Sequence, residues 1–247
     1  MIKSKPSVRI PAKIAGDLGV KIVSGRFKVS SILDGEVEAS GQRKVSRSAY
    51  REAVRILVAK GLVESRPKIG TRVSTVDRWH LLDPDVLAWM FAREPHPHLL
   101  TSLFELRRLV EPEAAALAAQ RRSEKQLACM ASAVEDMARK TLATSAGRQA
   151  DQLFHSTLLQ ASGNPFLETL SSSVAAAINW STLFKSRMQR PMRDSIPDHR
   201  KVYEAVAAAD SKAARAAMIA LIDLAFTDTT RVQPAKAKSP KRGPARR

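Results

Sequence analysis

The feature that most restricts the fold of this 247-residue chain is the helical spacing of apolar residues from Leu99 onward. Alanine and leucine recur there about every three to four residues, and no alternating strand pattern competes with them. The pattern predicts about five or six helices of ordinary length, and hence a helical bundle rather than an α/β fold. Glycine, proline or aspartate marks the expected breaks at Gly147, 163–165, Pro191, Pro197 and Asp210.

The N-terminal part of the chain has a different pattern. Residues 46–61 show clear helical spacing, with Ser46 or Ser48 available to cap the start of the helix. Residues 62–74 then predict two short strands joined by a glycine-containing loop. Helices followed by a basic hairpin are typical of a winged helix-turn-helix.

Four segments follow from these patterns. They are a winged helix-turn-helix domain at 1–76, a linker with a short helix at 77–97, a helical domain at 98–231, and a basic tail at 232–247 that we expect to be disordered. The net charge of +17 is concentrated at the two ends, where residues 1–76 contribute +10 and the tail contributes +6. A near-neutral body with basic ends favours nucleic acid as the partner of the N-terminal segment.

Two absences from the sequence limit the compartment. No run of about 18 consecutive apolar residues is present, and no secretory signal is recognised, so neither a membrane span nor export is expected. The single cysteine, Cys129, can form no internal disulfide, which agrees with a reducing compartment. We therefore expect a cytoplasmic protein without a membrane partner.

The helix predicted at 46–61 carries residue types that read DNA. Arg47, Ser48 and Arg51 lie in its first turns, from which guanidinium groups and hydroxyls reach base edges in a major groove. Ser46 can cap this helix, and the helix N-terminus can itself hold a phosphate. Considered without their surroundings, the two arginines would be ordinary solvated charges.

The predicted hairpin adds a second candidate contact with DNA. Lys68 and Arg72 flank Gly70 near its tip, in positions suited to the DNA backbone or the minor groove. Contacts to phosphate fix the position of a protein on DNA, whereas contacts to bases give sequence preference. The hairpin is therefore expected to position the head, and the helix to select the sequence.

These segments resemble a known family. Residues 45–63 contain Val-Ser-Arg, Arg-Glu-Ala and Gly-Leu-Val in order, and with Gly70 they resemble the winged helix-turn-helix of the GntR family of bacterial repressors. Residues 98–229 resemble the helical ligand-binding domain of its FadR-type branch, the FCD domain. The residues that carry this second resemblance are 105–119, 151–155, 161–165 and His199.

The resemblance implies a mainly α protein that is not an enzyme, with a winged helix followed by an all-α bundle. It implies a homodimer on double-stranded operator DNA, because two heads on a two-fold axis match a palindrome. It also implies a repressor of sugar-acid catabolism genes, controlled by a small carboxylate such as galactonate.

The resemblance further assigns residues in the helical domain. Asp151 and His155 are four residues apart on a predicted helix, so both project from one face, and His199 joins them from another helix. A third histidine would be expected 22 residues after His199, where this chain has Leu221. The remaining Asp/His/His set suits Zn, Ni or Mn, and Arg107 is assigned to the effector carboxylate.

Two other functions remain open at this point. A metal-dependent hydrolase would use Asp151, His155 and His199, although no acid, base or nucleophile is identifiable beside them. A sequence-neutral architectural or RNA-binding protein would explain the basic charge, but an aromatic content of 5% is low for a base-stacking surface. On spacing alone, His155 is more often a packed core histidine than a metal ligand.

Overall fold

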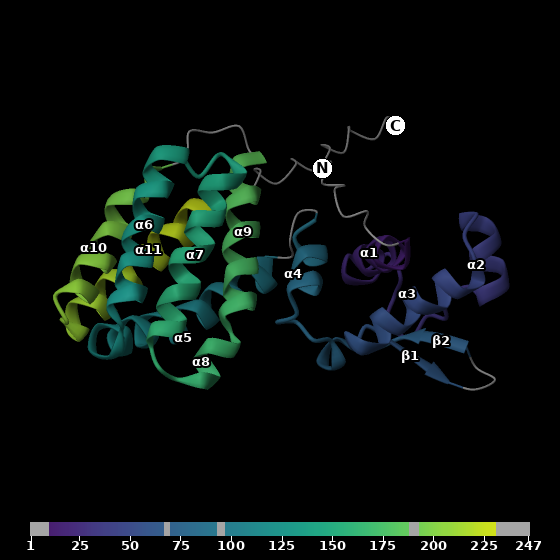
Figure 1. Ribbon diagram of the computed structural model, residues 1–247. Helices are drawn as coiled ribbons and strands as arrows, with labels where there is room; N and C mark the ends of the chain where they lie inside the picture. The colour runs from purple at the N-terminus through teal and green to yellow at the C-terminus, as the bar shows by residue number, and fades with distance from the viewer. Residues whose placement is uncertain (1–9, 67–69, 93–96, 188–192, 231–247) are drawn as a thin grey trace, which may run out of the picture.

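The computed structural model describes residues 10–66, 70–92, 97–187 and 193–230. Figure 1 shows a small N-terminal head and a larger helical body, with the short helix α4 (Pro84–Met90) between them. The mainly α architecture with one small hairpin confirms the predicted fold class. Within the described ranges, no helix is both long enough and apolar enough to cross a membrane.

The head consists of three helices and a two-stranded antiparallel sheet. They follow the order α1 (Ile10–Val23), α2 (Glu36–Arg43), α3 (Arg47–Ala59), β1 (Val63–Arg66) and β2 (Gly70–Val73). The helices α1 and α3 pack against each other because each presents one apolar face, and their contact forms the core of the head. The buried residues at this contact include Ile14, Leu18, Ile22, Tyr50 and Leu57.

Local signals fix both ends of α3. The Ser46 hydroxyl accepts a hydrogen bond from the Ala49 N–H, so of the two predicted caps it is Ser46 that occupies the N-cap. The helix stops just before Gly61. The φ of +72° at this position is a left-handed conformation that favours glycine. A side chain at this position would also collide with the backbone carbonyl of Arg78.

The helix α4 belongs to both parts of the molecule. Its residue Val86 is buried in the core of the head, whereas the next residue, Leu87, is buried in the core of the body. The short 3-10 helix η1 (Val76–Arg78) precedes α4 in the chain. The Asp83 side chain caps the first turn of α4. The predicted linker helix is therefore an element that joins two cores.

Seven helices make up the described part of the body. They are α5 (Pro97–Arg121), α6 (Glu124–Lys140), α7 (Ser145–Ala161), α8 (Pro165–Thr169), α9 (Ser171–Arg187), α10 (Ile196–Ala207) and α11 (Ser211–Thr230). The helix α7 packs against α5, α6 and α9, so it lies at the centre of the bundle. Side chains of α7 that face these helices, among them Asp151 and His155, are therefore buried.

Two predicted breaks lie inside helices. Gly147 is in the first turn of α7, because the helix starts at Ser145 and Thr144 caps it by accepting from the Gly147 N–H. Pro197 is in the first turn of α10, where a proline lacks no helical hydrogen bond. Pro191 and the tail at 232–247 lie outside the described residues.

Candidate functional site

The exposed face of α3 presents the residues predicted to contact DNA. Ser46, Arg47, Ser48 and Arg51 are all exposed, and they lie opposite the buried face that packs on α1. Among the described residues, neither Arg47 nor Arg51 has an ion-pair partner, whereas Arg55 pairs with Glu52 at 3.4 Å. Both guanidinium groups are therefore free to meet an anionic partner.

Two of the predicted hairpin residues, Gly70 and Arg72, lie on β2. Gly70 begins this strand with a φ of +96°, which explains why glycine is needed there. Arg72 lies opposite Glu64 in the antiparallel register and is half-buried. Lys68 lies outside the described residues.

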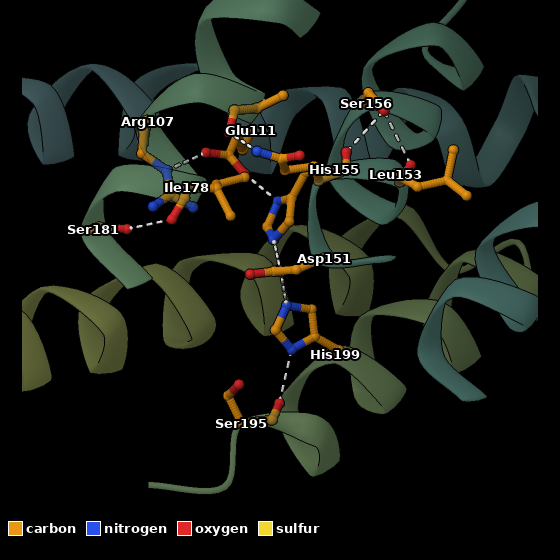
Figure 2. Close-up of polar contacts among 12 residues, drawn as sticks. Arg107, Glu111, Asp151, Leu153, His155, Ser156, Ile178, Ser181, Ser195 and His199 are labelled. Carbon is orange, nitrogen blue, oxygen red and sulfur yellow. Dashed lines mark hydrogen bonds and ion pairs between the residues drawn. The ribbon is translucent and has the colours of Figure 1, made fainter. Parts of the chain in front are cut away.

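The second candidate site is a buried cluster at the centre of the body. Asp151 and His155 come from α7, and His199 comes from α10. Each offers one ligand atom, and these three atoms lie within 4.8 Å of one another. The carboxylate Oδ1 of Asp151 is 3.1 Å from Nε2 of His199 and 3.5 Å from Nε2 of His155. The structure therefore brings the predicted set together (Figure 2).

In each histidine of this cluster, the Nδ1 atom lies within hydrogen-bond distance of an acceptor oxygen. Nδ1 of His155 lies 2.5 Å from Oε2 of Glu111, and Nδ1 of His199 lies 2.8 Å from the carbonyl oxygen of Ser195. A carbonyl or an ionised carboxylate only accepts, so both Nδ1 atoms carry the proton. The Nε2 atoms of both rings face the Asp151 carboxylate.

Glu111 is the acidic residue that sequence reasoning missed. It lies one helical turn after Arg107 on α5, and its Oε1 accepts from Nε of Arg107 at 2.6 Å. The exposed fraction of the side chain is 5% for Arg107 and 0% for Glu111. The sequence signal was an ordinary i,i+4 charge pair, which usually lies on a helix surface. Glu111 therefore supplies the anionic partner that a buried Arg107 requires.

The charges around Glu111 fix its ionisation. Burial alone would raise the pKa of Glu111, but Arg107 and His155 outweigh burial and lower the pKa to about 2. The pKa of Asp151 is likewise lowered, because contacts with His199, His155 and Arg107 outweigh its burial. Both carboxyl groups are therefore ionised in the folded protein at neutral pH.

The donor set of the cluster fits a divalent metal ion. Two imidazole nitrogens and one carboxylate oxygen converge, and this set of ligand atoms suits a divalent cation. Glu111 and the Ser195 carbonyl hold the outer nitrogens in the manner that fixes ring orientation in metal sites. Leu221 is buried in the core of the body and offers no ligand atom, so the described residues supply three ligands at this cluster.

Comparison with known proteins decides the family. Residues 11–73 match the family described as "Bacterial regulatory proteins, gntR family", and residues 102–224 match the FCD domain. The galactonate operon transcriptional repressor of Escherichia coli strain K12 is 32% identical over 213 residues, which cover 85% of this chain and 92% of that protein. The chain belongs to the GntR family.

A further relative is similar to this chain in sequence, and two solved structures are similar to it in fold. The HTH-type transcriptional regulator LutR of Bacillus subtilis strain 168 is 32% identical over 208 residues, covering 81% of this chain and 91% of the relative. The fold matches the Listeria monocytogenes regulator Lar with a TM-score of 0.63 and 17% identity, covering 94% of this chain and 100% of that structure. It also matches McbR/YncC of E. coli with a TM-score of 0.53 and 16% identity, covering 91% and 99%.

The GntR family membership confirms a DNA-binding transcriptional regulator with a winged head and an FCD body. The relatives are named as transcriptional regulators, and they give no support to the hydrolase or to the architectural protein.

Proposed function

We propose that this GntR regulator represses genes for the catabolism of a sugar acid related to galactonate. The body would bind the acid, and the bound acid would change the affinity of the head for its operator. The observation that carries the proposal is the buried Asp151, His155 and His199 cluster beside Arg107, in a chain 32% identical to the galactonate operon repressor. We propose no enzymatic reaction, and we propose the cytoplasm as its location.

The DNA contact is proposed to come from the exposed face of α3. Arg47 and Arg51 lie one helical turn apart on this face, so both guanidinium groups can enter one major groove. Ser46 and Ser48 lie beside them at the helix N-terminus, where hydroxyl and backbone N–H groups suit a phosphate. Lys68, Gly70 and Arg72 of the hairpin would contact the DNA backbone or the minor groove. A homodimer is proposed because one small head offers few specific contacts.

The effector is proposed to bind where Arg107 meets the three-residue cluster. Arg107 donates to Glu111 through Nε, and within the described residues its two Nη groups have no hydrogen-bond partner. These groups can hold a carboxylate in two parallel hydrogen bonds. Asp151, His155 and His199 would hold Zn, Ni or Mn with positions left for ligand oxygen atoms. When bound, such an ion supplies a positive centre that attracts the carboxylate and neighbouring hydroxyl groups of the acid.

The central test is binding of the purified protein to DNA from upstream of its own gene. Fluorescence anisotropy would be recorded with excess competitor DNA, with and without D-galactonate and other hexonates. We expect binding that resists the competitor and is changed by one acid. If excess competitor DNA abolished binding to the upstream DNA, this result would contradict an operator-specific regulator. If no acid changed the binding, this result would contradict the sugar-acid effector.

The α3 assignment predicts the effect of two substitutions. Arg47→Ala and Arg51→Ala are each expected to weaken operator binding by about 1 to 3 kcal/mol, because each removes a guanidinium group from the major groove. The control is Arg55→Ala on the same helix, since Arg55 is paired with Glu52 and is expected to contribute little. Equal operator affinity in all three variants and the parent would contradict the assignment.

The metal assignment predicts a separate loss in the body. His155→Ala is expected to lower the bound metal and the response to the acid, while DNA binding without the acid stays intact. Metal content by elemental analysis and operator binding by anisotropy measure the two effects. His80→Ala is the control, because His80 is exposed and lies outside the cluster. A full response to the acid in metal-free His155→Ala protein would rule out the metal site.

A further inference from the structure

A hollow on the head lies outside the face of α3 that is proposed to read DNA. It has a volume of about 300 Å³ and opens where the hairpin meets the 3-10 helix η1. Three arginines line it, and among its described lining residues they are opposed by one acid, Glu64. The arginines are Arg66 on β1, Arg72 on β2 and Arg78 in η1. The hollow therefore carries an excess of positive charge.

The pairing of the two strands brings the charged residues of the hairpin to one face. Val63 and Val73 oppose each other in the antiparallel register, and both are buried in the core of the head. Successive side chains of a strand point to opposite faces of a sheet. Glu64 and Arg72, the next opposed pair, therefore lie on the outer face of the hairpin. Arg66 comes two residues after Glu64, so it shares this outer face.

Arg78 reaches the hollow from outside the hairpin, and its backbone is fixed in place. Its N–H donates to the Thr75 carbonyl at 3.0 Å, and its own carbonyl lies against Gly61 at the end of α3. Its Nη1 lies 2.8 Å from Oε2 of Glu64. The wall that η1 contributes is therefore attached both to the hairpin and to the end of α3.

One carboxylate serves two of the three arginines. Glu64 pairs with Arg66 at 3.2 Å and with Arg78 at 2.8 Å, whereas Arg72 has no ion-pair partner among the described residues. The loss of hydration would raise the pKa of Glu64, but the contacts with Arg66 and Arg78 outweigh it and lower the pKa. The side chains of Arg66 and Arg78 are 54% and 59% exposed, so a further anion can reach both guanidinium groups.

The chemistry of the hollow suits a phosphate group that projects from a larger molecule. Guanidinium groups bind phosphate through charged, often paired hydrogen bonds. Small-molecule sites are usually enclosed and mostly apolar, whereas this hollow is lined mainly by polar residues and is open at its exposed arginines. The hairpin also lies beside α3, in a head that matches a DNA-binding family (Figure 1). The DNA backbone is therefore the phosphate source that these observations favour.

We propose that this hollow binds a phosphate of the DNA backbone, and that Glu64 competes with this phosphate for Arg66 and Arg78. The inference rests on the proposed function, since it assumes that α3 and the hairpin meet DNA together. It adds two contact residues, Arg66 and Arg78, and a residue that opposes binding. Contacts with phosphate carry no sequence information, so Glu64 lowers the affinity for every DNA by a similar factor. The contacts made by α3 then account for a larger share of the binding.

Fluorescence anisotropy of the full-length protein at several salt concentrations would test this role, on the DNA upstream of its gene and on an unrelated duplex. In Arg78→Ala and in Arg66→Ala, we expect both affinities to fall about tenfold, the loss of one charged hydrogen bond. The slope of log affinity against log salt should decrease by about one for each head. In Glu64→Gln, both affinities should rise about two- to fivefold, because an exposed ion pair no longer competes with the phosphate.

The ion pair between Glu113 and Arg215 in the body supplies matched controls. It is exposed and has a distance of 2.7 Å, so Arg215→Ala and Glu113→Gln change the net charge equally at a distant place. Both controls are expected to bind each DNA as the parent does. Effects in the controls as large as those in the hollow would show that only the net charge matters, and would overturn the inference.

The remaining outcomes separate the phosphate site from its alternatives. A loss confined to the upstream DNA in Arg78→Ala would indicate a base contact, and an unchanged affinity in Glu64→Gln would exclude the competition. Titration with ATP at constant ionic strength tests a free phosphate compound as the ligand. Loss of ATP binding in Arg78→Ala with unchanged DNA binding would overturn the inference in favour of a small ligand. If the parent did not prefer the upstream DNA, the proposed function would fail, whereas the unrelated duplex would still test the hollow.

Discussion

Glu111 connects the two halves of the buried site through one carboxyl group. One oxygen accepts from Arg107 at 2.6 Å, and the other lies 2.5 Å from Nδ1 of His155. The same group therefore balances the charge of the proposed effector-binding arginine and orients a proposed metal ligand. A change at Glu111 is expected to affect effector binding and metal binding together.

Glu111→Gln is predicted to destabilise the protein at neutral pH by about 2 to 4 kcal/mol, because it leaves the Arg107 charge buried without an anionic partner. Urea unfolding measures this loss. The matched control is Glu113→Gln on the same helix, whose pair with Arg215 is exposed and is expected to contribute about 1 kcal/mol or less. Equal stability of the two variants would contradict the role assigned to Glu111.

The same carboxyl group gives a pH dependence with a defined sign. The pKa of Glu111 is lowered from 4.5 to about 2 in the folded protein, so its ionised form favours folding. Its contribution is complete above about pH 4.5 and is lost as the pH falls from 4.5 toward 2. The stability difference between the parent and Glu111→Gln should therefore shrink over this interval.

Among the elements, α4 contacts both the head and the body. Lys60, at the C-terminal end of α3, lies 2.7 Å from Asp83 and 2.9 Å from Asp85 at the start of α4. On the other side, the Ser173 hydroxyl of α9 donates to the Leu82 carbonyl just before α4. The helices α3 and α9 are thus both attached near the N-terminal end of one short element, which lies between the head and the body (Figure 1).

The fit of α4 against α1 predicts a contrast between two glycines. A Cβ at Gly19 would overlap the indole ring of Trp89, whereas a Cβ at Gly16 would be 3.5 Å from its Nε1. Gly19→Ala is expected to cost about 1 to 3 kcal/mol of stability through overpacking. Gly16→Ala should be neutral or stabilising by up to about 1 kcal/mol, as expected for alanine in a helix. Thermal unfolding would measure both, and equal midpoints would contradict the close α1–α4 contact.

The sequence predicted the elements whose signals are local. The helix α3 was evident because its apolar spacing, its Ser46 cap and its Gly61 stop coincide within one segment. The linker helix was expected, but its position in both cores depends on the partners of Val86 and Leu87, which periodicity cannot supply. The four-residue spacing predicted that Asp151 and His155 share one helix face, whereas their proposed role as metal ligands came from the family resemblance. Glu111 was missed because its role depends on helices that meet only in the folded chain.

For the whole molecule, the proposed function requires that acid and operator influence each other reciprocally. If the acid changes the operator affinity by some factor, the operator must change the acid affinity by the same factor. We expect typical coupling of about 1 to 3 kcal/mol, measured by titrating the acid with and without saturating operator DNA. If the acid and the operator changed each other's affinity by different factors, the acid would have to act on a further equilibrium besides operator binding.

A substitution at Lys60 tests whether the contact between α3 and α4 carries the coupling between acid binding and operator binding. Lys60→Met is expected to reduce the coupling factor, because it removes the ion pairs between α3 and the start of α4. The intrinsic affinity for the acid should not change, since the buried cluster in the body is untouched. An unchanged coupling factor would exclude the Lys60 contact as the connection between head and body.

The overlap between residue 19 and the Trp89 ring also has a consequence for evolution. A substitution at either position changes which side chains the other can carry, because the indole ring occupies the space that a methyl group at residue 19 would need. Related chains that carry alanine or a larger residue at the first position should have a smaller side chain at the second. The two positions are therefore expected to covary across lineages, although they lie 70 residues apart in the chain.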